Sequence, residues 1–123
     1  MKLFTGKKGE DFAECYLKKK GFKTLFRNFK TELGEIDLIS LDQETVVFVE
    51  VKTSSSMEFG SPEARVNHRK QRQIIKVAQS FLKMQCKTNT DCRFDVISVL
   101  LNANREPSIE HFENAFEVHG YNS

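Results

Sequence analysis

The stretch Val46-Val47-Phe48-Val49-Glu50-Val51-Lys52 is a run of β-branched and aromatic residues that ends in a carboxylate and an ammonium group. This composition predicts a buried strand. Because side chains alternate between the two faces of a strand, Glu50 and Lys52 should share one face while the alternate valines point into the core. Charged groups in a buried strand are rare unless they are paired or bind a metal. The stretch therefore marks both the centre of a sheet and a candidate site.

A second apolar stretch, residues 35–41, carries Asp37 near its middle. It is separated from the first by Asp42-Gln43-Glu44, which is short enough to be a hairpin connection. Antiparallel pairing about that turn would place Asp37 and Glu50 nearly opposite each other. Adjacent carboxylates repel unless a cation lies between them, and oxygen ligands of this kind suit Mg²⁺. The residues alone leave a second interpretation open, a structural ion cluster of Asp37, Glu50 and Lys52.

The rest of the chain predicts further helices and strands around this pair. They are a helix over residues 6–20, a strand over 23–29, a helix from Ser61-Pro62 to about 85, and strands over 93–101 and 107–112. Gly21 favours a helix stop, and Ser61 before Pro62 is typical of a helix start. Strand 93–101 is apolar on both faces and should be central. The order α-β-β-β-α-β-β predicts an α/β or α+β fold with a mixed sheet flanked by helices, in one domain spanning residues 1–123.

Two charged residues lie where the helical periodicity would favour apolar ones. Glu10 is three residues before Ala13 on the stripe of the first helix, and Lys70 is four before Ile74 on the stripe of the second. An acidic group beside a metal and a cation beside a phosphate would explain both positions. Helix ends that extend past the sheet would explain them equally well.

Charge is distributed in alternating blocks along the chain. Residues 1–30 carry nine Lys and Arg against three Asp and Glu, and residues 31–60 carry one against seven. Residues 61–90 carry seven against one, and residues 91–123 carry two against six. Two basic segments around an acidic one suit a polyanion held over a carboxylate cluster that binds a cation, although solvated helix faces give the same pattern.

Bulk composition narrows the class of protein. With 39% hydrophobic and 29% charged residues, the chain should be a soluble globular domain. The N-terminal residues do not read as a signal peptide, and the longest apolar run is too short for a membrane span. The cysteines, Cys15, Cys86 and Cys92, form no CxxC motif, which favours buried or half-buried free thiols. We therefore expect a cytoplasmic protein without membrane contact.

Several stretches together resemble a known family. They are Gly9-Glu10 with Ala13 and Tyr16-Leu17, Arg27-Asn28, Gly34-Glu35-Ile36-Asp37-Leu38-Ile39, Val47-Phe48-Val49-Glu50-Val51-Lys52, and Arg93-Phe94-Asp95-Val96. The combination resembles the YraN-like family of the PD-(D/E)XK nuclease superfamily, whose fold is similar to that of Holliday-junction resolvases. The resemblance implies a restriction-endonuclease-like mixed sheet.

The resemblance also implies an activity, the Mg²⁺-dependent or Mn²⁺-dependent hydrolysis of DNA phosphodiester bonds. The metal would be held by Asp37, Glu50 and Glu10, with the Val51 carbonyl as a further ligand. Glu10 and Lys52 would complete the catalytic set with Asp37 and Glu50, Glu10 by orienting a water and Lys52 by positioning or helping to deprotonate it. The expected nucleic-acid contacts are Arg27, Arg65, Arg69, Lys70 and Arg72. Branched, flapped, nicked and single-stranded DNA all remain open as substrates, and a homodimer is expected if two cuts are made.

An alternative function is a nucleic-acid-binding module that keeps the fold but does not cut. Its affinity would come from the cations of residues 65–76 and would fall steeply with salt. The position of Lys52 beside two carboxylates favours the nuclease, because a module that only binds has little use for it.

Overall fold

The computed structural model describes residues 2–55, 66–86, 89–101 and 105–117, with side chains from residue 7 onward. Its elements, in chain order, are α1 (Lys2–Lys19), β1 (Lys23–Thr31), β2 (Gly34–Asp42), β3 (Thr45–Ser54), α3 (His68–Met84), β4 (Cys92–Leu100) and β5 (Ser108–Phe116). This order is the predicted one, so the α+β class with a mixed sheet is confirmed. Neither described helix offers a stretch long and apolar enough to span a bilayer.

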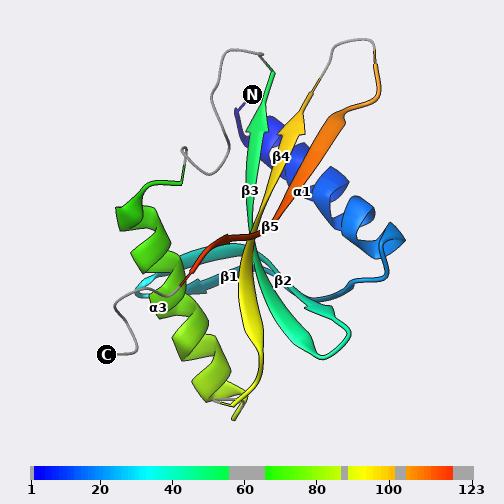
Figure 1. Cartoon of the computed structure of the whole chain (residues 1–123). Coiled ribbons are helices and arrows are strands. Elements are labelled where there is room, and N and C mark those ends of the chain that lie inside the picture. The colour runs from blue at the N-terminus through cyan, green and yellow to red at the C-terminus, as the bar shows by residue number, and fades with distance from the viewer. Residues whose placement is uncertain (1, 56–65, 87–88, 102–104, 118–123) are drawn as a thin grey trace.

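The sheet has the strand order β1-β2-β3-β4-β5, and neighbouring strands are antiparallel except for the parallel pair β3 and β4. The two helices lie on opposite sides of this strongly twisted sheet (Figure 1). Strand β4 lies between β3 and β5, which confirms the central position predicted from its apolar faces. The parallel pair requires a crossover, and α3 lies within it.

Adjacent residues of β3 pack into two separate hydrophobic clusters. Val46 and Phe48 belong to the cluster that packs against α3, together with Ile74, Val77 and Phe81 of that helix. Val47 and Val49 belong to the cluster that packs against α1, together with Ala13 and Leu17. The strict alternation of the strand thus sends one set of side chains to each helix. Glu50, two residues after Phe48, continues the α3-side row.

The predicted start of the second helix is partly wrong. Asn67 is extended, with φ −69° and ψ 170°, and its side chain accepts a hydrogen bond from the backbone N–H of Lys70 at 2.9 Å. The cap of α3 is therefore Asn67 and this helix begins at His68. Ser61, Pro62 and Arg65 lie outside the described residues.

In β1 and β2, the regular alternation of side chains between the two faces of the sheet is interrupted at the same level. Arg27 contacts α1 whereas Phe29 packs on Phe81 of α3, although residues two apart in a regular strand share a face. The partner strand does the same, because Leu38 belongs to the α1-side cluster and Ile36 to the α3-side cluster. The pairs Arg27–Leu38 and Phe29–Ile36 enclose Asn28 on one strand and Asp37 on the other.

Asn28 takes the conformation that makes this change possible. Its φ is +54°, in the left-handed region, which asparagine tolerates better than other residues with a side chain. Asp37 lies directly across, at the point where β2 passes from one core to the other. The carboxylate is therefore at the boundary between the two layers.

Candidate active site

Asp37 and Glu50 lie side by side in the middle of the neighbouring strands β2 and β3. The register of the hairpin runs from Asp42–Thr45 at the turn to Leu38–Val49, with Gln43 and Glu44 as its two turn residues. Beyond that pair, Asp37 Oδ2 accepts a hydrogen bond of 2.8 Å from the backbone N–H of Val51. The predicted proximity of the two carboxylates is thus present in the structure.

The environment of Asp37 disfavours its negative charge. Burial, followed by repulsion from Glu50, raises the pKa of Asp37 from 3.8 to about 8, against the hydrogen bond from Val51. Among the described residues, no Lys or Arg makes an ion pair with Asp37. Asp37 is therefore available to bind a cation. A cation between Asp37 and Glu50 would offset both the cost of burying the charge and the repulsion between the two carboxylates.

Glu50 is better compensated than its neighbour. Its side chain is 8% exposed, and its Oε2 lies 3.6 Å from Lys52 Nζ and 3.8 Å from Lys70 Nζ. The position of Lys52 follows from the strand alternation, and that of Lys70 from the first turn of α3. Lys70, at the edge of the apolar stripe, thus lies beside the predicted site.

Glu10 reaches the same region from the other layer. A buried glycine precedes it in α1, and a Cβ atom on Gly9 would lie 1.8 Å from Thr53 Oγ1 of β3, so the helix backbone approaches the strand closely there. Glu10 raises the pKa of Asp37 through its charge, while Lys70 acts in the opposite direction. Both helices therefore act electrostatically on one carboxylate, as its position at the layer boundary allows.

Arg27 is held by carboxylates of α1. Its guanidinium pairs with Glu10 at 3.4 Å, Asp11 at 2.6 Å and Glu14 at 3.4 Å, and it donates to the carbonyl of Lys7 at 3.2 Å. The predicted contact of Arg27 with nucleic acid stays a prediction. Its observed contacts instead fix Glu10 against β1, which sequence reasoning missed because α1 and β1 meet only in the tertiary structure.

The first turn of α3 concentrates cations where the helix dipole opposes them. Arg69 and Arg72 are exposed, and Lys70 is the third cation of this turn region, which has no acidic residue. Positive side chains at a helix N-terminus are unfavourable, whereas anions are favoured there. The three cations therefore do not stabilise the helix, and the turn region suits the binding of an anionic ligand.

The Arg93-Phe94-Asp95 stretch forms a structural network away from these residues. Asp95 is fully buried and accepts hydrogen bonds from Arg93 Nε at 3.0 Å and from the backbone N–H of Asn114 at 2.9 Å. His111 Nε2 lies 2.7 Å from Asp95 Oδ2. Although burial acts to raise it, the hydrogen bonds from His111 and Arg93 hold the pKa of Asp95 below its ordinary value.

Two expectations about exposure are wrong. From the sequence we expect His111 to be a surface residue, because it has no partner at metal-ligand spacing, but its side chain is only 2% exposed, since Tyr16 and Phe22 pack edge-on against its ring. The cysteines Cys15, Cys86 and Cys92 are free, as expected, but exposed rather than buried. Cysteine burial is a statistical tendency that no periodicity in this sequence specified.

The donor set fits a hard divalent cation. No three His, Cys, Asp or Glu side chains of the described residues converge as a closed metal site. Mg²⁺ is commonly bound through one or two carboxylates and keeps several waters, so Asp37 and Glu50 meet its needs without a third side chain. Glu10 as a further ligand stays a prediction, since its side chain accepts a hydrogen bond from Arg27.

Comparison with known proteins places the chain in a family. Residues 9–99 match the model described as "Uncharacterised protein family UPF0102". The chain belongs to the UPF0102 family. The resemblance to the YraN-like family is thereby confirmed.

Similar UPF0102 proteins occur in several bacteria. One from Geobacter metallireducens is 46% identical over 113 residues, covering 92% of both chains. Another from Caldanaerobacter subterraneus is 44% identical over 117 residues, covering 94% of this chain and 96% of the relative. A third from Persephonella marina is 42% identical over 113 residues, covering 92% of this chain and 93% of the relative. The UPF0102 match includes Glu10, Asp37, Glu50 and Lys52.

Proposed function

We propose that this UPF0102 protein is a metal-dependent endonuclease that hydrolyses phosphodiester bonds of DNA. The observation that carries the proposal is the adjacency of Asp37 and Glu50, with Lys52 beside them and no cation on Asp37 among the described residues. Burying a carboxylate that has no ion-pair partner next to another carboxylate is costly for a purely structural cluster. It is the expected state of a pair whose partner is a divalent cation.

Asp37 and Glu50 would hold the metal, Mg²⁺ or Mn²⁺. When bound, the metal supplies Lewis-acid polarisation of a phosphate oxygen and stabilises developing negative charge. The protein's own groups do the rest. Lys52, whose Nζ lies 3.6 Å from Glu50 and whose side chain is 24% exposed, would orient the attacking water and, as the neutral amine, would accept its proton. Glu10, braced by Arg27, can orient a water from the α1 side.

The cations of α3 would bind the phosphate groups of the DNA substrate. Lys70 connects the carboxylates to the first turn of α3, where Arg69 and Arg72 are exposed. Phosphate groups there would meet both the helix dipole and three positive side chains. Branched or otherwise structured DNA is the substrate class that the family resemblance favours.

The test is divalent-metal binding by calorimetry, followed by cleavage assays. Wild-type protein should bind Mn²⁺ or Mg²⁺, and Asp37→Asn should bind roughly tenfold more weakly or worse because a charged ligand is lost. Cleavage of linear, flapped and branched DNA should require the metal and stop with chelator. If neither protein binds metal with DNA present and wild type cuts nothing, the site is a structural cluster and the non-catalytic binding module becomes the better reading.

A pair of substitutions at Asn28 tests how the site is positioned. Asn28→Gly should behave as wild type, because glycine accepts the left-handed conformation. Asn28→Val should lower the melting temperature, at a cost of roughly 1–3 kcal/mol for strain, and should weaken Mn²⁺ binding because Asp37 loses its orientation. Thermal melts and calorimetry on the two variants measure both effects. Equal Mn²⁺ affinity in the valine and glycine variants would show that Asn28 does not position Asp37.

A further inference from the structure

Three exposed cations of α3 form a stripe that leads away from the candidate site. The helix contains Arg69, Lys70, Arg72, Lys76 and Lys83 and not one Asp or Glu. Arg69, Lys76 and Lys83 are seven residues apart and therefore share one helical face, the exposed one, opposite the buried Ile74, Ala78 and Phe81. A solvated helix face usually mixes both signs of charge, which gives favourable pairs four residues apart. This face has no such pairs.

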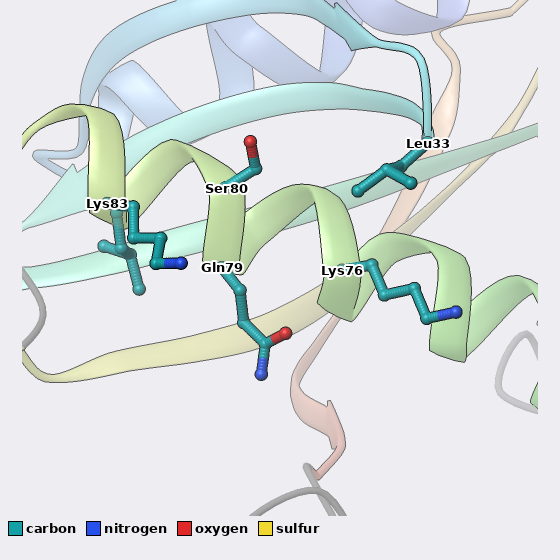
Figure 2. A pocket seen from close by; sticks show the side chains of 6 residues that line it. Leu33, Lys76, Gln79, Ser80 and Lys83 are labelled. Atoms are coloured by element: carbon teal, nitrogen blue, oxygen red, sulfur yellow. The ribbon is translucent and has the colours of Figure 1, made fainter.

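The far end of the stripe lines an open surface pocket. A cavity of about 590 Å³ lies against the C-terminal half of α3, and Figure 2 shows Leu33 of the β1–β2 turn beside the helix there. The described lining residues are Leu33, Lys76, Gln79, Ser80, Leu82 and Lys83. Their polar groups are ammonium, amide and hydroxyl, and none is acidic. Donors of these kinds make most phosphate and sugar contacts in protein–DNA complexes.

The dimensions of the stripe match a length of duplex. From Arg69 to Lys83 is fourteen residues, or about 21 Å along a helix axis at 1.5 Å per residue. That length corresponds to about six base pairs at 3.4 Å each. The stripe begins at the turn that carries Lys70, whose ammonium lies 3.8 Å from Glu50. A backbone bound along α3 would therefore be continuous with the candidate site.

We propose that the Arg69–Lys76–Lys83 face of α3 binds one arm of a DNA duplex, about six base pairs long, that extends from the point of cleavage. This inference rests on the proposed function and adds the substrate's form, a duplex arm on the α3 side. An acidic protein segment is the competing occupant. The donor set of the pocket and the continuity with the carboxylate pair favour nucleic acid.

The test compares two double variants of the full-length protein, with DNA binding measured by fluorescence anisotropy in chelator across a salt series. Lys76→Gln/Lys83→Gln removes two charges from the stripe, and Lys18→Gln/Lys19→Gln removes two exposed charges at the end of α1 as a matched control. The stripe variant should weaken duplex binding by roughly 10–10² at about 0.1 M salt and lower the salt slope by about 1.8, at about 0.9 per lost phosphate contact. The control variant should change the duplex affinity and the salt slope by no more than a few tenths of the changes expected for the stripe variant.

Duplex length gives a second readout. Wild type and control should gain affinity as the duplex arm is lengthened to about six base pairs, and the stripe variant should lose most of this gain. If the stripe variant matches the control in slope and in length dependence while wild type still cuts with metal, the footprint is wrong and the nuclease stands. If polyglutamate displaces duplex DNA from wild type as well as unlabelled duplex does, the face is a protein-docking surface. If wild type neither binds duplex nor cuts it, both proposals fail.

Discussion

Replacing Asp37 with asparagine should abolish metal-dependent cleavage and at the same time make the protein harder to unfold. The substitution removes a charge that the metal requires, so cleavage should fall by roughly 10³-fold or more. It also removes the repulsion from Glu50 and the cost of burying the charge, while the amide oxygen can still accept from Val51. Loss of activity with gain of stability is the signature of a functional carboxylate rather than a structural one.

The gain in stability should depend on pH in a defined direction. The pKa of Asp37 is raised to about 8 in the folded state, so the folded protein holds this proton more tightly than the unfolded chain does. Wild type therefore loses stability from this group as pH rises from about 4 to about 8, whereas the asparagine variant does not. The difference in unfolding free energy should be near zero at pH 4 and reach roughly 3–6 kcal/mol above pH 8, at about 1.4 kcal/mol per unit of pKa difference.

Denaturant unfolding of the two proteins in chelator between pH 4 and pH 9 measures this difference. Glu35→Gln is the matched control, because it removes one charge from the same strand at a partly exposed pair with Lys30 and should change stability by less than about 0.5 kcal/mol. The same concentration of Mg²⁺ should stabilise wild type more than Asp37→Asn. An asparagine variant that is less stable than wild type at pH 8 would show that the Asp37 charge is structurally compensated.

Replacing Lys52 with alanine should lower the cleavage rate by roughly 10²–10⁴-fold while the protein still folds and binds metal. The ammonium lies 3.6 Å from Glu50, so its removal takes away a competitor for that carboxylate. Metal affinity should therefore stay the same or increase, in contrast to Asp37→Asn.

Single-turnover cleavage and calorimetry separate the two effects. Lys70→Ala is the informative comparison, since Lys70 also lies beside Glu50 but on the helix that carries the DNA-binding cations. Its loss should weaken DNA binding more than it slows the bound complex. Lys52→Ala cutting at the wild-type rate would remove Lys52 from the catalytic set and return it to the ion cluster.

The local geometry of strands, turns and helices explains how much of the fold and of the candidate site could be predicted from the sequence. The β2–β3 hairpin joins two apolar runs across a two-residue turn, so strand period and turn length were enough to bring Asp37 and Glu50 together. The same alternation put Lys52 beside Glu50. Helical spacing placed Glu10 and Lys70 at the edges of their stripes, close to the site. Each of these inferences involves residues that a single strand, turn or helix relates to one another.

The wrong or missing inferences involve residues that only packing relates. Arg27 reads as a free cation until α1 lies across β1 and surrounds it with three carboxylates. His111 reads as a surface residue until the Asp95 network encloses it. An asparagine inside a predicted strand was the available signal for the left-handed Asn28, because asparagine disfavours strands and tolerates positive φ.

By itself, the sequence determined the order of the elements, the mixed sheet and the pairing of the two carboxylates, because these depend on side-chain periodicity and on short connections. Only the tertiary structure decided that Asp37 lies at the boundary between two cores, within reach of charges from both helices. That position depends on β1 and β2 changing faces together at Asn28, and on helices placed by separate hydrophobic clusters. Electrostatic energy depends on distance and burial, which no spacing along the chain specifies.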